Sequence, residues 1–309
     1  MMEPLQHAFG PVPSRRLGNS LGLSPIPPKT CNYSCTYCQL GRTNHMTGNR
    51  QAFYPVEEII REFELYLKDA DKFDVVTIVG EGEPTLYAGL GELIDQVKQR
   101  TDKPVAVITN GALLWDPQVR KELAQCDIVL PSLDAWDEET FRAVDRPLGS
   151  LDFQKIQQGL VDFSHEYTGQ LWVEIMLCGG VNDSQDSIDH FAQILQKIRY
   201  DRVYINTPVR PPAEPDVRVA SPDSIQYAVE KLGAISIDML SAGSFFSEIP
   251  DDYEAILSII ARHPMNQFEV ASFLESRCVS NKNSILDNLQ HDSRVECVDY
   301  KGILSFRRK

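Results

Sequence analysis

Three absences narrow the possible roles of this chain of 309 residues. No apolar run reaches the ~20 residues that a membrane-spanning helix needs, so we expect no membrane association. The first residues lack a charged start followed by an apolar stretch, so we expect no secretory signal and a cytoplasmic protein. The seven cysteines are an odd number, which does not suit a framework of disulfides.

Acidic residues are missing from one long segment of an otherwise acidic chain. The formal net charge is −14, which argues against nucleic-acid or anionic-membrane binding over the whole surface. Residues 4–56 nevertheless contain no Asp or Glu, where the average of the chain predicts about seven or eight. The same segment contains the basic residues Arg15, Arg16, Lys29, Arg42 and Arg50. They predict a locally positive patch, unless several are buried in ion pairs with acids from later in the chain.

Short apolar runs alternate with amphipathic stretches as far as about residue 240. Strands are predicted near 17–23, 73–79, 105–109, 128–130, 171–177 and 203–205, and helices near 55–69, 90–100, 116–125, 150–167 and 184–199. This alternation predicts an α/β fold with a parallel sheet covered by helices. Six such units make either a doubly wound sheet or a complete or partial barrel of the TIM type, and periodicity alone does not choose between them.

The last 60 residues follow another pattern. Three short helices are predicted at 251–263, 266–277 and 280–292, and two strands, RVECVDY and ILSFRRK, follow around a turn at Lys301–Gly302. This order is typical of a winged-helix module, so we expect a first domain at 1–245 and a winged-helix domain at 246–309. The third helix pattern has one Lys against two Asp, which favours a lid or docking role over DNA reading.

Three cysteines, Cys31, Cys35 and Cys38, fall within eight residues. Thiolates are soft ligands that suit iron–sulfur clusters or zinc. A structural zinc site or an electron-transfer cluster wants a fourth ligand, and His45, seven residues on, is poorly placed to be one. Three protein ligands would leave one metal position open for chemistry. Zinc with a distant fourth ligand remains the alternative.

Polar motifs follow three consecutive predicted strands. They are Gly80-Glu81-Gly82-Glu83-Pro84, Thr109-Asn110-Gly111 and Ser132-Leu133-Asp134. Each has a simpler explanation: a glycine turn with a solvated acid, an Asn-Gly turn, and an N-cap for a helix near Trp136. Polar residues at three neighbouring strand ends suit an active site at the carboxyl edge of a barrel better than three independent caps.

The spacing C-x3-C-x2-C, with Tyr37 before the last cysteine, resembles the signature of the radical S-adenosylmethionine superfamily. The resemblance covers about residues 9–240. It implies a partial (βα)6 barrel of the TIM type with a [4Fe–4S] cluster on Cys31, Cys35 and Cys38. S-adenosylmethionine would bind the open iron and be cleaved reductively to a 5′-deoxyadenosyl radical, which removes hydrogen from a substrate.

The resemblance also implies roles for residues at the strand ends. Gly82 and Glu83 would receive the ammonium group of the methionine part, Thr109 and Asn110 would lie near the cofactor, Ser132 and Asp134 would reach its methionine or ribose part, and Tyr37 would lie near the adenine. Cys178, where the fifth strand should end, is the candidate catalytic residue for exchanging a hydrogen atom. The alternative for Cys178 is a small buried apolar residue.

A narrower match is to the wyosine-synthase-like branch of the superfamily. It rests on Phe9–Gly18, on Lys29–Asn32 and Cys38–Gly41 around the cysteine motif, and on Asn206–Pro212. The tRNA-modifying enzyme of that branch has extra cysteines ahead of the motif for a second cluster, and no cysteine precedes Cys31 here. We therefore do not expect the wyosine reaction itself.

Two functions follow as alternatives. The first is a radical enzyme acting on a tRNA, nucleoside or peptide, with a flavodoxin or ferredoxin-type electron donor. The positive patch near the cluster would bind this donor or an anionic substrate. The second is a redox-sensing regulator, in which the cluster controls binding of DNA or a partner by the winged helix. Glu83, Thr109, Asn110, Ser132 and Asp134 favour the enzyme, because a sensor needs no site for S-adenosylmethionine.

Overall fold

An eight-stranded sheet forms the centre of the computed structural model, which describes residues 5–237, 245–247, 249–279, 281–300 and 302–309. Its strands, in spatial order, are β1 (Ala8–Ser14), β2 (Gly18–Leu23), β5 (Val75–Ile78), β6 (Val105–Thr109), β7 (Ile128–Pro131), β8 (Gln170–Met176), β9 (Arg202–Asn206) and β10 (Ile235–Ser236). β1 is antiparallel to β2, and every later neighbour is parallel. The α/β fold with a mostly parallel sheet is thus confirmed.

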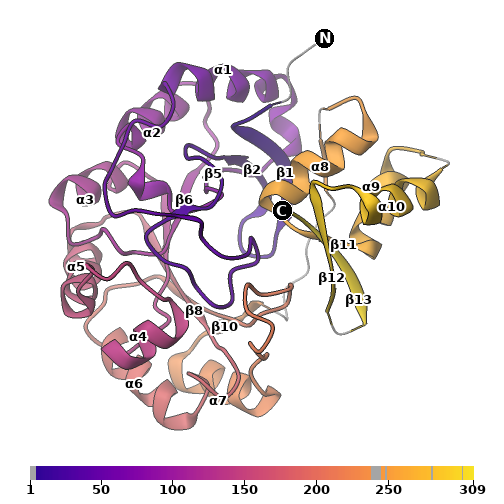
Figure 1. Ribbon diagram of the computed structural model, residues 1–309. Helices are drawn as coiled ribbons and strands as arrows, with labels where there is room; N and C mark the ends of the chain where they lie inside the picture. The colour runs from indigo at the N-terminus through magenta and orange to yellow at the C-terminus, as the bar shows by residue number, and fades with distance from the viewer. Residues whose placement is uncertain (1–4, 238–244, 248, 280, 301) are drawn as a thin grey trace.

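The helices lie in an arc around the outside of these strands (Figure 1). They are α1 (Val56–Tyr66), α2 (Leu90–Lys98), α3 (Pro117–Leu123), α4 (Glu138–Val144), α5 (Phe153–Glu166), α6 (Gln185–Leu195) and α7 (Pro222–Leu232), with short 3-10 turns η1 (Leu67–Lys72) and η2 (Pro84–Leu86). From β2 onward the strands stand in chain order without reversal. A doubly wound sheet reverses its strand order at a switch point, so this topology argues against that alternative.

Both faces of the parallel strands are buried, which explains their continuous apolar runs. Val76 and Val107 join the large core that the strands share with the outer helices. Their neighbours Val75 and Ala106 belong to a smaller cluster on the opposite face, together with Tyr204. Because side chains alternate along a strand, each run had to be apolar at every position.

The C-terminal part is a separate set of elements (Figure 1). They are α8 (Asp252–Arg262), β11 (Met265–Asn266), α9 (Gln267–Ser276), α10 (Lys282–His291), β12 (Val295–Tyr300) and β13 (Ile303–Arg308). The three strands form an antiparallel sheet in the order β11-β13-β12. The three predicted helices and the strand pair are therefore present. Ser280, Lys301 of the predicted turn, and 238–244 before the expected domain boundary lie outside the described residues.

The C-terminal part packs on β1. Phe9 and Val12 of β1 share one apolar cluster with Phe245 and with Ile256 of α8. The backbone N–H of Phe246 also donates to the carbonyl oxygen of Pro11 at 3.0 Å. The two parts therefore share a core across the edge of the large sheet.

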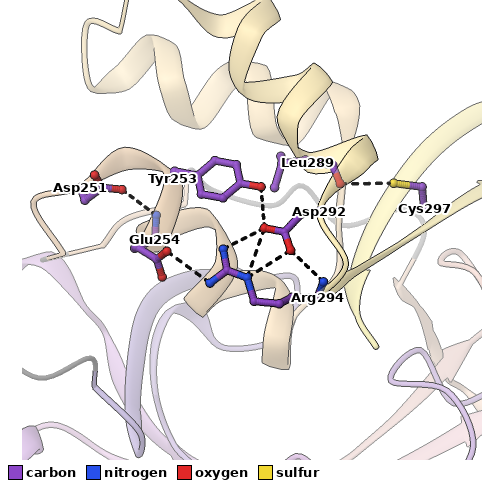
Figure 2. A network of polar contacts seen from close by, with 7 residues as sticks. All are labelled: Asp251, Tyr253, Glu254, Leu289, Asp292, Arg294 and Cys297. Atoms are coloured by element: carbon purple, nitrogen blue, oxygen red, sulfur yellow. Dashed lines mark hydrogen bonds and ion pairs between the residues drawn. The ribbon is translucent and has the colours of Figure 1, made fainter.

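A polar network holds the elements of the C-terminal part together (Figure 2). The Tyr253 hydroxyl of α8 donates to Asp292 Oδ2 at 2.9 Å, and Arg294 Nη2 donates to the same oxygen at 2.8 Å. Arg294 also reaches Glu254 of α8 at 3.4 Å. Asp292 ends α10, so this network fastens α10 and β12 to α8.

Several elements were not predicted from the sequence, among them β1, α7 and the two-residue strands β3 (Thr30–Cys31) and β4 (His45–Met46). β1 contains Gly10, Pro11 and Pro13, which disfavour a strand, but Pro is tolerated at the edge of a sheet, where β1 lies. α7 has just two buried residues, so its pattern is weak. α4, which begins close to the helix start considered near Trp136, is only two turns long. No helix in the described part of the chain is long and apolar enough to cross a membrane.

Candidate functional site

Most of the predicted site residues follow the carboxyl ends of the parallel strands. The cysteine loop comes after β2, Gly82 and Glu83 after β5, Thr109 and Asn110 at the end of β6, Ser132 and Asp134 after β7, and Cys178 after β8. Parallel strands bring these ends to one edge of the sheet. The topology thus gathers at one edge residues that lie up to about 150 positions apart in the chain.

The cysteine loop is tied to its neighbours mainly through backbone groups. The N–H of Thr36 donates to the carbonyl oxygen of Val144 at 2.8 Å, and Cys38 N–H donates to Cys35 O at 3.1 Å. On the other side, Glu83 N–H donates to Thr30 O at 3.1 Å. A Cβ at Gly82 would lie 1.8 Å from the same Thr30 oxygen. Only glycine allows the loop after β5 to lie this close to the cysteine loop.

Each cysteine has a distinct environment. Asn110 Nδ2 lies 3.7 Å from Cys31 Sγ, and Cys35 Sγ lies 3.5 Å from Asp145 Oδ1. Burial raises the pKa of all three thiols, and Glu83 and Asp145 add to the rise at Cys31 and Cys35 respectively. A bound metal would displace these protons, since thiolates are the metal-binding form.

The donor set fits an iron–sulfur cluster. Within the described residues, no three His, Cys, Asp or Glu side chains are grouped so as to hold a single metal ion. A [4Fe–4S] cluster needs no such convergence, because each thiolate binds its own iron. Asn32, which is fully buried beside Cys31, has an Nδ2 without a hydrogen-bond partner among the described residues. This N–H group could donate a hydrogen bond to a sulfur atom of a bound cluster.

Glu83 is buried and strongly hydrogen-bonded. Its Oε1 accepts from Thr85 N at 2.9 Å, Thr85 Oγ1 at 2.5 Å and Thr109 Oγ1 at 2.6 Å, while Oε2 accepts from Asn110 N at 2.8 Å. Burial raises the pKa of this carboxyl, and the hydrogen bonds from Thr109 and Thr85 oppose the rise. A carboxylate has about four acceptor sites. Oε1 is saturated, so Oε2 is the oxygen that can accept one more donor.

Tyr37 and Asp134 contact each other directly. The Tyr37 hydroxyl donates to Asp134 Oδ2 at 2.5 Å, and Met176 N–H donates to Asp134 Oδ1 at 2.7 Å. Burial raises the pKa of Asp134 to about 6. The N-cap of α4 is Asp137, so capping of that helix does not explain Asp134. Ser132 and Asp134 both line a small cavity of about 30 Å³ together with Asn110.

Asn110 is both a turn residue and a link to the cysteine loop. Its Oδ1 accepts from Ala112 N at 2.9 Å, as in a simple Asn-Gly turn, and Gly111 has a positive φ of 76°. Its Nδ2 donates to Asn32 Oδ1 at 2.7 Å. The end of β6 is thereby fixed to the residue that follows Cys31.

Cys178 does not reach the main cavity. It is 1% exposed, and its backbone N–H donates to Asn182 Oδ1 at 2.6 Å. It is absent from the residues that line the large cavity described below. Burial raises the pKa of its thiol. The environment is that of a small buried residue, which was the alternative for Cys178.

A cavity of about 600 Å³ opens beside the cysteine loop. Its walls come from the sheet, from the cysteine loop through Tyr37 and Cys38, and from the C-terminal part through His263 and Tyr300. Its volume falls within the ~300–1,000 Å³ usual for small-molecule sites. The described residues leave His263 Nδ1 buried and without a hydrogen-bond partner. Burial lowers the pKa of His263 well below its usual value, and Arg210, Arg15 and Arg16 reinforce this.

Among the residues that the structure describes, at least three of the five basic residues in the acid-free segment are held in ion pairs. Arg16 pairs with Glu174 and Arg50 with Glu122, and both arginine side chains are 18% exposed. Arg42 is 68% exposed but makes a two-pronged contact with Glu214. For these three residues the structure favours the alternative, pairing with acids from later in the chain.

Sequence reasoning missed Asp145 and the contacts of Arg307, whose basic tail Arg307–Lys309 could simply have been solvated. Asp145 is buried beside Cys35, and Arg307 donates to backbone oxygens of the cysteine loop and of the loop after β9. Asp145 lies 110 residues from Cys35 and Arg307 lies 268 residues from Gln39. No local motif marks either residue, so only the fold could reveal them.

Comparison with known proteins places the chain in a family. The model of the Radical SAM superfamily matches residues 26–193, more than half of the chain. The chain belongs to the radical SAM superfamily. It is 34% identical over 303 residues to the UPF0026 protein of Methanocaldococcus jannaschii, covering 96% of this chain and 94% of that protein.

Two further similarities cover different shares of the proteins compared. The chain is 37% identical over 309 residues to the protein named GTPase Obg of Brachyspira hyodysenteriae, covering 97% of this chain but only 45% of that one. It therefore spans less than half the length of that relative. The solved structure of anSMEcpe with bound AdoMet has a TM-score of 0.51 at 18% identity, covering 69% of this chain and 57% of that one. This similarity shows a shared fold.

Membership of the superfamily makes the chain a radical SAM enzyme. The family uses a [4Fe–4S] cluster and S-adenosylmethionine. The cysteine loop is the part of this chain whose donor set fits the cluster, and the adjoining cavity has the volume for small-molecule ligands.

Proposed function

We propose that Cys31, Cys35 and Cys38 hold one [4Fe–4S] cluster at which S-adenosylmethionine is cleaved reductively, and that a substrate reacts in the adjoining cavity of about 600 Å³. When bound, the two cofactors supply a 5′-deoxyadenosyl radical that removes hydrogen from the substrate. The observation that carries the proposal is that the three thiols and Glu83 follow strand ends at one edge of the sheet, and that Cys38 also lines this cavity. The sheet then represents the partial (βα)6 barrel of the family.

Glu83 binds the ammonium group of S-adenosylmethionine in this proposal. Its Oε2 accepts a single hydrogen bond, from Asn110 N, so it retains acceptor capacity. Thr109 and Thr85 hold the carboxylate in place through Oε1. Gly82 lets the loop after β5 lie against Thr30, next to Cys31. The chain thus supplies a fixed negative charge beside the open metal position, where a cationic ligand group is stabilised.

Tyr37 and Asp134 act as a positioning pair. The hydrogen bond between them fixes the ring of Tyr37, which lines the cavity next to Cys38. A fixed aromatic ring gives the adenine a surface to pack on. Ser132 and Asn110 line the small cavity that Asp134 also lines, and in this proposal they bind the methionine or ribose part.

The C-terminal part handles substrate in this proposal. The order α8-β11-α9-α10-β12-β13 is that of a winged helix, which we assign to 246–309, with 1–245 as the radical SAM domain. His263, Asn266 and Tyr300 contribute to the cavity wall, so this domain contacts whatever occupies the cavity. The substrate is a tRNA, a nucleoside or a peptide whose reacting group enters there.

The regulator alternative receives no support. The helix α10, which would read DNA, has Lys282 as its only Lys or Arg, and this side chain pairs with Glu275. Phosphate contacts would therefore be few. All seven cysteines are free, so Cys31, Cys35 and Cys38 are available as ligands.

The test is a single anaerobic reaction. Reconstituted protein with S-adenosylmethionine and dithionite is analysed for 5′-deoxyadenosine and methionine. The proposal predicts both products in equal amounts, with a slow rate when no substrate is present. Absence of 5′-deoxyadenosine from protein that holds four irons per chain would contradict it. The cavity residue His263 offers a second test, because His263→Ala should lower turnover of the true substrate but keep this slow cleavage.

A further inference from the structure

A group of basic side chains lies on the outer side of the cysteine loop. Lys29, Arg307, Arg308 and Lys309 line a cleft of about 170 Å³ together with Leu40 and Asn44 of the loop. Lys29 precedes Cys31 by two residues, whereas the other three come from β13 and the residue after it. The fold therefore joins two basic segments that lie almost at opposite ends of the chain.

Arg307 anchors this arrangement. It is buried, pairs with Glu296, and donates through Nη1 to the carbonyl oxygens of Gln39 at 3.4 Å and Pro211 at 3.2 Å. Gln39 is the residue after Cys38. The end of β13 is therefore held against the cysteine loop, and the side chains that follow Arg307 have a defined position relative to it.

Three cations of the group are available to a partner, and we call them the basic edge: Lys29, Arg308 and Lys309. Arg308 and Lys309 are exposed, and Lys29 is partly exposed. Among the residues that the structure describes, none of the three forms an ion pair. The acid that lines the same cleft, Glu81, is buried and lies 3.5 Å from Arg262. The edge is thus positive in a chain whose net charge is −14.

The basic edge also lies close to the cysteines. A Cβ placed on Gly41 would lie 3.7 Å from Lys29 Nζ and 3.9 Å from Arg307 Cζ. Gly41 in turn donates its backbone N–H to Cys38 O at 3.1 Å. Two cations and a cluster ligand thus surround one short turn. An electron that enters here would have a short path to the cluster.

We infer that the basic edge is the docking surface for an acidic one-electron donor protein. This rests on the proposed function, since only a reducible cluster needs a donor. Opposite charge raises association rates by roughly ten- to thousand-fold at low salt, and without a local positive surface an acidic enzyme repels an acidic donor. The cleft of about 170 Å³ is smaller than the ~300–1,000 Å³ of most small-molecule sites. This size favours a protein surface over a bound metabolite.

The test compares charge reversal at two places in the full-length reconstituted enzyme. The double variant Arg308→Glu/Lys309→Glu reverses the basic edge. The control Lys121→Glu/Lys197→Glu makes the same change of charge at exposed lysines that form no ion pair among the described residues. Reduction of the cluster by a reduced acidic flavodoxin is followed by stopped flow at increasing salt, and reduction by dithionite is measured in parallel.

The inference predicts at least a tenfold slower reduction by flavodoxin for the basic-edge variant at low salt. The rate of reduction by flavodoxin should fall only slightly for the control. The larger fall for the basic-edge variant should diminish at high salt, because salt screens exposed charges. Arg308→Gln/Lys309→Gln should lie between wild type and the reversal. Dithionite should reduce all proteins alike, and failure of dithionite with the wild type would instead count against the proposed function.

Three results would overturn the inference. Equal flavodoxin rates in the basic-edge variant and wild type would remove the docking role. Equal losses in both double variants would mean a general effect of net charge. Tight binding of inorganic phosphate that Arg308→Gln/Lys309→Gln abolishes, with flavodoxin reduction unchanged, would make the cleft a small-anion site instead.

Discussion

Arg307 Nη1 lies 3.4 Å from the carbonyl oxygen of Gln39, so a strand near the end of the chain is hydrogen-bonded directly to the cysteine loop. The same guanidinium reaches Pro211 and Pro212 at 3.2 Å each and pairs with Glu296 at 2.9 Å. One buried side chain thus joins the C-terminal part, the loop after β9 and the loop that holds the cysteines.

We expect Arg307→Ala to destabilise the protein by about 2–3 kcal/mol, because removing one partner of a buried pair leaves the other groups unsatisfied. Glu296 is 42% exposed, which keeps the loss below the full cost of a buried charge. Denaturant unfolding of the anaerobic protein measures it. The neighbouring exposed residue provides the control, since Arg308→Ala should change stability by less than about 0.5 kcal/mol. Equal effects of the two variants would show that Arg307 is no anchor.

Replacing Cys31, Cys35 or Cys38 singly by Ala should prevent assembly of a full four-iron cluster. Each thiolate binds its own iron in such a cluster, so the two remaining thiolates cannot replace the missing one. Iron content and the visible absorption of reconstituted protein measure the change. Cys278→Ala is the matched control, because this thiol is exposed and distant in the chain. Full iron content in the triple variant would refute the assignment.

Glu83→Gln should weaken S-adenosylmethionine binding. A hydrogen bond to a charged group contributes about 1.5–3 kcal/mol, which corresponds to an affinity loss of roughly ten- to a hundredfold. The variant should also be less stable, because an amide nitrogen cannot accept the buried hydrogen bonds that this carboxylate accepts. Calorimetry gives the affinity and denaturant unfolding gives the stability.

Thr85→Val separates these two effects. It removes the hydroxyl donor to Glu83 Oε1 and keeps the negative charge. Stability should fall while affinity for S-adenosylmethionine stays near that of the wild type. If Thr85→Val weakens binding as much as Glu83→Gln, the charge of Glu83 is not what binds the cofactor.

Asp292 should make stability dependent on pH in the acid range. Its hydrogen bonds, first from Arg294 and also from Tyr253, hold the pKa of Asp292 well below its usual value (Figure 2). A depressed pKa stabilises the folded state above the unfolded pKa of about 4 and loses this effect as the pH falls towards the folded pKa. The difference in Tm between wild type and Asp292→Asn should therefore be present at neutral pH and shrink below about pH 4.

The control for Asp292 is Asp287, on the exposed face of α10. Its side chain is 73% exposed and faces His291 at 3.7 Å. Asp287→Asn should leave Tm almost unchanged over the same pH range, because exposed pairs contribute little. A constant difference in Tm for Asp292→Asn at every pH would show that the network acts through packing and not through charge.

Local patterns were sufficient for most of the α/β fold. The runs that became β5 and β6 are apolar at every position, because their side chains alternate between two buried layers. β1 escaped this reasoning because Pro11 and Pro13 oppose a strand, and only its place at the sheet edge permits them. Prediction was correct where burial alone determined the sequence pattern. It was wrong where the position of a strand in the sheet determined which residues the strand tolerates.

The candidate site also has features that the sequence predicted and features that it did not. Cys31, Cys35 and Cys38 lie in one loop, and Gly82, Glu83, Thr109, Asn110, Ser132 and Asp134 each lie at or after the end of a strand, so their spacing in the chain was enough to propose a site. Which acid pairs with which arginine depends on contacts over long separations, such as Arg42 with Glu214, 172 residues apart. The sequence by itself determined the family, the candidate cluster ligands and the strand ends that the other candidate residues follow. Only the tertiary structure decided that Arg50 is neutralised by Glu122, that Cys178 is buried, and that Arg308 and Lys309 lie beside the cysteine loop, because charge pairing and burial are properties of neighbours in space.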